Sequence, residues 1–248
     1  MTVLFVLLGL LVGGLVNQLG SDLPARRRLT RPHCPYCGRD RPRWQWLSLP
    51  AYLIGRAGCS SCGAPISLRH PLVEVGLAVI YGYLWITLGP SVKLILYLLY
   101  STIFTLIFIT DIERRVILNV VVYPSILFAL VASFFTPGMK WWSALAGGAI
   151  AFTFFLGAAL VGNAVFGSGA LGGGDVKLAA FVGLVTGFPW VIEALVLTIL
   201  IGAAVSLILL ITRVRSRRDY IPYGQFLVAG AMVTLLWGYP IAKWFIYR

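Results

Sequence analysis

Acidic residues are scarce in this chain. It has 8 Asp and Glu against 20 Lys and Arg, and only 2 His and 4 Cys, among 248 residues. Charged residues make up 11% of the sequence and apolar ones 59%, with a mean hydropathy of +0.90. So little charge excludes a globular domain whose whole surface is solvated by water, and it indicates an integral membrane protein.

Long apolar runs are present instead, several of them close to the ~20 residues that a helix needs to cross a bilayer. We predict an all-α, polytopic membrane protein of about eight transmembrane helices. The predicted spans are residues 3–19, 72–89, 92–110, 116–135, 142–165, 176–188, 190–212 and 224–246. The sixth is short and ends at Gly187-Phe188-Pro189. It is therefore a tilted or broken helix, or one half of a hairpin with the seventh.

The distribution of basic residues predicts how the helices are oriented in the membrane. Most of the 20 Lys and Arg lie in segments 20–71 and 111–115 and after residue 212. Alternating the spans places these segments on one side, which is cytoplasmic because cytoplasmic flanks are enriched in Lys and Arg. Both chain termini then lie outside. The net charge of +12 reflects this topology and contact with anionic lipid, and we expect no nucleic-acid binding.

All the cysteines lie in the one predicted non-membrane segment, residues 20–71. They form two CxxC pairs separated by 21 residues: Cys34, Cys37, Cys59 and Cys62. Two such pairs are typical of a four-cysteine zinc knuckle, in which each tight turn directs two thiolates at one ion. Gly38 and Gly63 follow the second cysteine of each pair, where the turn favours a positive φ.

Alternatives to a zinc knuckle remain. The cysteines could form disulfides or serve as redox-active or free thiols, although structural disulfides are rare in the cytoplasm. His33 could replace one of the ligands. If all four thiolates bind one ion, no coordination position is left for water, so the predicted zinc site is structural rather than catalytic.

Two acids stand out, because ionisable groups at membrane depth are costly and commonly functional. Asp111 follows the apolar run 92–110, and Asp175 precedes the apolar run 176–188. The predicted topology puts both at cytoplasmic helix ends. Two like charges in one site cannot both ionise cheaply, so one carboxyl stays protonated while the other remains a base. That division of roles is what an aspartyl protease uses.

The glycines before Asp175 suit the same chemistry. Gly172, Gly173 and Gly174 lack Cβ atoms and would let an extended substrate backbone approach the carboxylate, so we predict that they bind substrate. Simpler readings exist for each feature. The run 167–174 is also typical of a flexible loop, and Asp175 of a helix N-cap. Asp111 could pair with an arginine at 114 or 115.

The ordered motifs resemble the bacterial type IV prepilin peptidases, which belong to the GxGD class of aspartyl proteases. The resemblance covers nearly the whole chain. Its elements are an early helix ending near Asn17, the paired CxxC motifs, Pro65 to Glu74, Asp111, Gly172 to Leu178, and Ile221 to Leu227. The chain is thus expected to have three parts: a first transmembrane helix (1–19), a cytoplasmic loop that binds zinc (20–71) and a membrane protease core (72–248).

The resemblance implies a protein of the bacterial cytoplasmic membrane whose active site faces the cytoplasm. Asp111 and Asp175 would cleave the basic leader from prepilins or pseudopilins. The new N-terminus would then be methylated with S-adenosylmethionine, an activity that the resemblance places in loop 20–71. The acids that could receive a basic leader are Glu74, Glu113, Asp22 and Asp40.

The sequence departs from the family pattern at two places. Trp44 to Pro50 stands where an acidic residue and Asn-Ile-Pro are usual, and Val116 to Asn119 lacks the usual Ile-Pro or Leu-Pro step. The first departure leaves open a leader peptidase without methyltransferase activity. A proton-coupled transporter would also place carboxylates in the membrane beside Gly-broken helices. A non-enzymatic scaffold would need neither aspartate.

Overall fold

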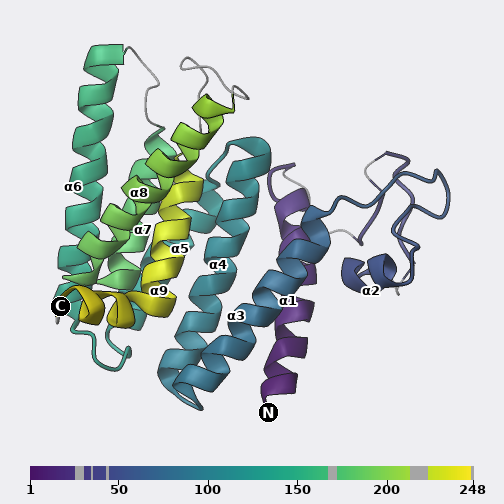
Figure 1. The fold of residues 1–248 in the computed structure, drawn as a ribbon, viewed down its shortest axis with the longest axis horizontal. Helices are drawn as coiled ribbons and strands as arrows, with labels where there is room; N and C mark the ends of the chain where they lie inside the picture. The colour runs from purple at the N-terminus through teal and green to yellow at the C-terminus, as the bar shows by residue number, and fades with distance from the viewer. Residues whose placement is uncertain (26–30, 35, 43–44, 167–171, 213–222, 247–248) are drawn as a thin grey trace. The chain divides into compact units, whose positions relative to one another are not determined.

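The computed structural model describes residues 1–25, 31–34, 36–42, 45–166, 172–212 and 223–246. Within them the regular structure is helical, with two isolated β-bridges in the cysteine segment, so the predicted all-α class is confirmed. The helices are α1 (Thr2–Asp22), α2 (Ser48–Leu53), α3 (Arg69–Leu88), α4 (Val92–Arg114), α5 (Asn119–Ser133), α6 (Trp141–Phe166), α7 (Gly173–Thr186), α8 (Trp190–Ile211) and α9 (Gly224–Ile246) (Figure 1).

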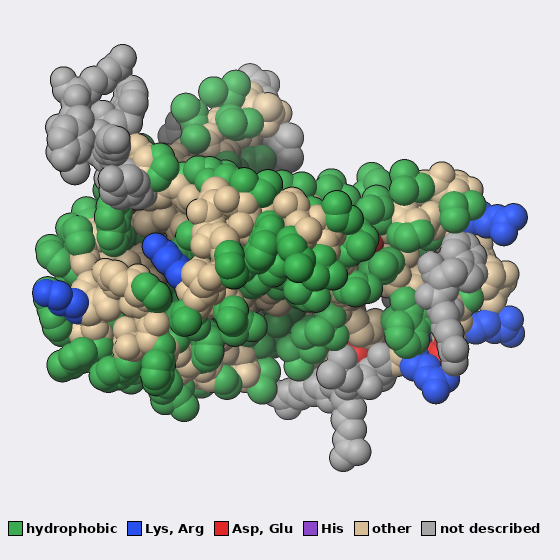
Figure 2. Space-filling model, turned by 90° about the horizontal axis from the view of Figure 1, so that it is seen from below, with side chains coloured by type: hydrophobic (Ala, Val, Ile, Leu, Met, Phe, Trp, Pro, Cys, Tyr) green, Lys and Arg blue, Asp and Glu red, His purple; other side chains and the backbone are tan. Residues whose placement is uncertain are grey.

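Each predicted span overlaps one of these helices. Among the described residues, α1, α3, α4, α6 and α8 are long and apolar enough to cross a membrane, and α5 and the first part of α9 are shorter apolar helices. Many large apolar side chains point outward from them, and hydrophobic side chains cover most of the face drawn in Figure 2. A surface of this kind requires lipid rather than water, and the chain is a multi-pass membrane protein.

The chain divides into two compact units, Met1–Ile109 and Thr110–Arg248. In the first unit, α1 packs along α3, and glycines of α1 lie at the contact. A Cβ at Gly13 would lie 2.6 Å from the Cα of Glu74, and a Cβ at Gly9 equally close to that of Ala78. Glycine therefore lets the two backbones approach closely, as is common between membrane helices.

Glu74 fixes the short helix α2 to this helix pair. Its carboxylate is 1% exposed. One oxygen accepts hydrogen bonds from the Ser48 N–H at 2.8 Å and the Ser48 hydroxyl at 2.6 Å, and the other accepts one from the Leu49 N–H at 2.9 Å. The Asn17 amide of α1 also lies 3.5 Å from Glu74. The acid thus satisfies the unpaired N–H groups at the start of α2 and is not free to receive a substrate.

Helix α7, the predicted sixth span, is the centre of the second unit. It packs against α5, α6, α8 and α9, and most of its side chains are buried. Its 14 residues rise about 21 Å, less than the ~30 Å of a bilayer core. Gly187, at φ +69°, ends the helix, and the Ser143 hydroxyl of α6 donates a hydrogen bond to the Phe188 carbonyl at 2.6 Å. The helix can be short because protein surrounds it.

The crossing of α6 and α7 depends on Gly147 and Gly183, because a Cβ on either would collide with the backbone carbonyl of the other. We expect Gly183→Ala to lower the free energy of unfolding by about 1–3 kcal/mol, because neither backbone can move away without separating the two helices. Gly157→Ala, on α6 where a Cβ meets open space, is the matched control. Thermal unfolding in detergent measures both, and equal midpoints for the two variants would contradict this packing.

Candidate active site and candidate metal centre

Asp111 lies in the last turn of α4 and is 3% exposed. Its Oδ2 accepts a hydrogen bond from the backbone N–H of Gln225 at 2.9 Å. Gln225 is the second residue of α9, so the carboxylate faces the N-terminal end of that helix, where the unpaired N–H groups and the helix dipole favour negative charge. The geometry therefore gives the Asp111 carboxyl one backbone donor that favours its ionised form.

Gly224 and Ile117 confine this carboxylate. A Cβ at Gly224 would lie 2.9 Å from the Asp111 Oδ2 and 3.0 Å from the Cδ1 of Ile117. A Cβ at Gly174 would lie 3.0 Å from the Cβ of the same isoleucine. Ile117 thus contacts the starts of both α7 and α9, and glycine at each start keeps the helices close to it.

Asp175 lies in the first turn of α7 and is 4% exposed. It interacts electrostatically with Asp111 and with Tyr223. The Tyr223 ring packs against Phe155, with 5.7 Å between the centroids, and against Phe226 at 5.9 Å. The start of α9 therefore contacts one carboxylate through its backbone and interacts with the other through its tyrosine.

Lys177, two residues beyond Asp175, is bound to α5. Its Nζ donates a hydrogen bond to the Asn119 Oδ1 at 3.1 Å and lies 5.0 Å from the centroid of the Tyr123 ring. Asn119 begins α5. This contact ties the start of α7 to the start of α5, so the lysine holds the aspartate-bearing helix in place.

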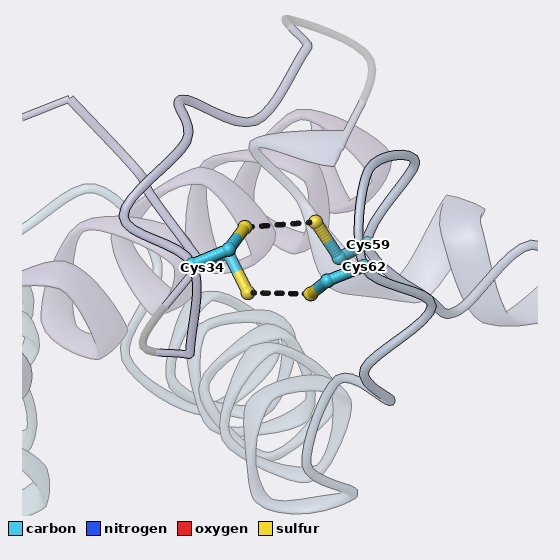
Figure 3. A group of neighbouring side chains, drawn as sticks. Cys34, Cys59 and Cys62 are labelled. Carbon is cyan, nitrogen blue, oxygen red and sulfur yellow. Dashed lines mark hydrogen bonds between the residues drawn. The ribbon is translucent and has the colours of Figure 1, made fainter.

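The four cysteines form a second cluster, in the first unit. All are free thiols, and their Sγ atoms lie within 4.8 Å of one another. The Sγ atoms of Cys34 and Cys62 are 3.7 Å apart, as are those of Cys37 and Cys59, and Figure 3 shows side chains from two loops converging. Four thiolates around zinc, at bond lengths of about 2.3 Å, would be separated by about 3.8 Å. The cluster therefore fits a tetrahedral ion.

The two halves of the cluster have the same backbone geometry. In each, the glycine after the second cysteine donates its N–H to the carbonyl of the first at 2.9 Å, Gly38 to Cys34 and Gly63 to Cys59. The glycines have φ values of +70° and +71°, which confirms the predicted turns. A β-bridge closes each turn, His33 with Asp40 and Gly58 with Pro65.

Backbone donors favour the thiolates of Cys59 and Cys34. The N–H groups of Cys62 and Ser61 lower the pKa of Cys59 to about 6. Burial opposes ionisation of Cys34, but hydrogen bonds from the backbone of Cys37 and Tyr36 outweigh it, so that its pKa is also lowered. Thiolates so close together repel one another unless a cation lies between them, which is the environment of a metal site.

The structure thus groups the predicted site residues into two sets. Asp111 and Asp175 come together with Gly174, whereas residues 167–171 of the glycine run, with Ile221 and Pro222, lie outside the described residues. The sequence motifs alone give no role to Ile117, Asn119 or the N–H of Gln225. A signal for the last was present, since the motif from Tyr223 to Leu227 begins a helix at the predicted cytoplasmic side.

The fold and the two sites together define a class of protein. It is a multi-pass helical membrane protein with two interacting, buried carboxylates at helix ends and a cluster of four cysteines. Residues 97–207 match the type IV leader peptidase family, and residues 7–88 match the bacterial peptidase A24 N-terminal domain. The chain belongs to the type IV leader peptidase family, which confirms the resemblance inferred from the motifs.

Several similar proteins are called prepilin leader peptidase/N-methyltransferase. That of Bacillus subtilis is 27% identical over 99% of this chain and 98% of its own length. That of Pseudomonas aeruginosa is 28% identical over 97% and 92%, and that of Myxococcus xanthus 31% identical over 86% and 64%. No solved structure matches the chain.

Proposed function

We propose that this protein is a membrane aspartyl endopeptidase that removes the leader peptide of type IV prepilins or pseudopilins. The family and the names of the similar proteins support the reaction and the substrate class. The burial and mutual electrostatic interaction of Asp111 and Asp175 carry the assignment of these two as the catalytic residues. A hydrolase of this kind needs both.

The two carboxyls have different surroundings, which suggests a role for each. Asp111, hydrogen-bonded at the start of α9, is the ionised base and takes a proton from the attacking water. Asp175 is the protonated partner and donates a hydrogen bond to the scissile carbonyl. Water adds to the carbonyl carbon, the tetrahedral intermediate loses the peptide nitrogen, and that nitrogen leaves as an amine carrying the proton that Asp111 removed.

The backbone before Asp175 supports binding of an extended substrate. Gly173 is exposed and a Cβ there would meet no other atom, so an incoming peptide can reach this edge of α7 without displacing a side chain. We propose Gly172, Gly173 and Gly174 as the residues that bind the substrate backbone. The positive-inside rule places this edge on the cytoplasmic side, from which the leader would enter.

N-methylation of the new N-terminus is the second proposed activity, because the similar proteins are named for it. S-adenosylmethionine would supply the methyl group when bound: its methyl–sulfur bond would break as the new carbon–nitrogen bond forms, the thioether S-adenosylhomocysteine would leave, and the amine would lose a proton. We assign no residue to this donor. If the four cysteines bind one tetrahedral ion, sulfur fills every coordination position, so the role of that ion would be to hold the segment folded.

A direct test uses the purified protein in lipid nanodiscs with a full-length prepilin. We expect a product whose new N-terminus lies directly after the basic leader, identified by mass spectrometry. Addition of S-adenosylmethionine should increase the product mass by one methyl group. Cleavage without methylation would support the leader peptidase that lacks transferase activity, and an enzyme inert on several prepilins would contradict the proposed function.

Metal content is a separate prediction. We expect about one zinc ion per chain, bound by the cysteine cluster, and its loss from Cys34→Ser and Cys59→Ser. Elemental analysis of protein purified without chelators measures this. Ser60→Ala, an exposed change between two cysteines, is the matched control and should retain the ion. Wild-type protein that contains no metal would favour the thiol alternative instead.

A further inference from the structure

The cysteine segment carries an exposed apolar surface around α2. No charged residue occurs from Gln45 to Gly55. Three large side chains of this stretch are exposed: Leu53 at 78%, Ile54 at 64% and Trp46 at 51%. A helix that was solvated by water on its outer side would carry polar residues there. We call Trp46, Leu53 and Ile54 the α2 apolar surface.

The depth of α2 along the membrane helices is fixed by its contacts within the first unit. The Ser48 and Leu49 N–H groups bind Glu74, which lies five residues beyond the start of α3, a rise of about 7.5 Å. Leu47 packs beside Gly14, where a Cβ would lie 2.9 Å from its Cδ2. Gly14 lies eight residues before the end of α1, or about 12 Å. The start of α2 is therefore level with the bodies of these helices, not beyond their ends.

That level lies just below the boundary of lipid headgroups and acyl chains. Helix α1 has 21 residues and α3 has 20, so each rises about 30 Å, the thickness of the bilayer core. A point some 7–12 Å inside their ends lies where interfacial helices bury their apolar faces. Leu68 and Leu72, at the start of α3, are apolar side chains that are also exposed, at 67% and 70%.

Charge agrees with a lipid partner. Arg56 lies two residues after Ile54 and is exposed, as a basic residue that reaches headgroup phosphates would be. Trp is common at this level of membranes, where its ring is apolar and its N–H remains hydrated. Basic residues beside an apolar patch bind the anionic cytoplasmic leaflet.

We propose that α2 is an interfacial membrane anchor, with Trp46, Leu53 and Ile54 inserted among lipids of the leaflet next to the cysteine cluster. The segment between α1 and α3 is then not a wholly aqueous loop. Glu74 holds it at the required depth by binding the start of α2. One consequence is that the cysteine cluster is kept close to the membrane surface, where the free N-terminus of a membrane-bound product would also lie.

Spin-label accessibility tests this placement in the full-length protein, in nanodiscs of phosphatidylethanolamine and phosphatidylglycerol with one copy each. The label is attached through a genetically encoded non-cysteine residue at Leu53 or Ile54. Leu11, exposed on α1, is the lipid reference, and Ser60, exposed between Cys59 and Cys62, is the water reference. Collisions with oxygen report acyl chains, and collisions with a water-soluble nickel chelate report solvent.

We expect Leu53 and Ile54 to behave like Leu11, with several-fold fewer nickel-chelate collisions than Ser60. Nickel accessibility equal to that of Ser60, at both positions and with the metal content retained, would overturn the proposal. If Leu53 and Ile54 are shielded from the nickel chelate only when one nanodisc holds two protein chains, the proposal is overturned too, in favour of a contact between chains. No cleavage is measured here, so this result is independent of the proposed function.

Discussion

Asp111→Asn and Asp175→Asn are each expected to reduce kcat for prepilin cleavage by at least about 10³-fold. Asparagine keeps the size of the side chain and can still accept the Gln225 N–H, but it neither takes nor donates the catalytic proton. Because a proton-transfer role acts on the chemical step, kcat should fall while KM changes little. Initial rates of leader removal in nanodiscs measure both constants.

Glu113→Gln is the matched control for this pair. Glu113 lies two residues beyond Asp111 on the same helix and is exposed, so its substitution removes a nearby acid without entering the site. We expect kcat close to that of the wild type, and a role of Glu113 in receiving the basic leader would change KM alone. If either aspartate variant is folded, retains zinc and cleaves at the wild-type rate, the assignment of the pair is wrong. A transporter would instead show ion flux that depends on the aspartates.

Gly224→Ala should lower kcat by about 10²-fold without unfolding the protein, because a displacement of about 1 Å can cost that much. The added Cβ would lie 2.9 Å from the Asp111 Oδ2 and 3.0 Å from Ile117. The carboxylate, the flexible partner, would have to move away from the N–H of Gln225. The same kinetic assay, with the thermal midpoint measured alongside, distinguishes misplacement of the base from loss of the fold.

Gly157→Ala again serves as the control, since its Cβ meets open space in the same unit. It should match the wild type in both activity and stability. A Gly224→Ala enzyme with wild-type kcat would mean that the contact between α9 and Asp111 does not position the base. The catalytic assignment itself would then rest on the aspartate variants alone.

The membrane helices could be predicted from the sequence because each apolar run carries its own signal. Every predicted span overlaps a helix, and the ends of span and helix differ by a few residues. For example, α1 covers Thr2–Asp22, whereas the predicted span is residues 3–19. The weakest prediction was the sixth span, where a helix of 14 residues carries Asp175 and Lys177. Its place at the centre of the second unit depends on neighbours, and no local pattern encodes it.

The helix α2 was missed for a related reason. It has only six residues, too few to give a periodic signal, and its start is stabilised by Glu74, 26 residues away from Ser48. The same acid was predicted to be available for a basic leader, and its hydrogen bonds to Ser48 and Leu49 now account for it. When the hydrogen-bond partners of a buried carboxylate lie far away in the sequence, residue spacing alone does not reveal its role.

The sequence by itself determined the class of this protein, because hydropathy, the spacing of two CxxC pairs and the order of the motifs are local properties of the chain. It also singled out Asp111 and Asp175, since acids next to apolar runs are rare. Only the tertiary structure decided that both interact, that α9 supplies the N–H to Asp111, and that Ile117 packs between the helix starts. These contacts join residues more than 50 positions apart, and packing, not sequence pattern, selects them.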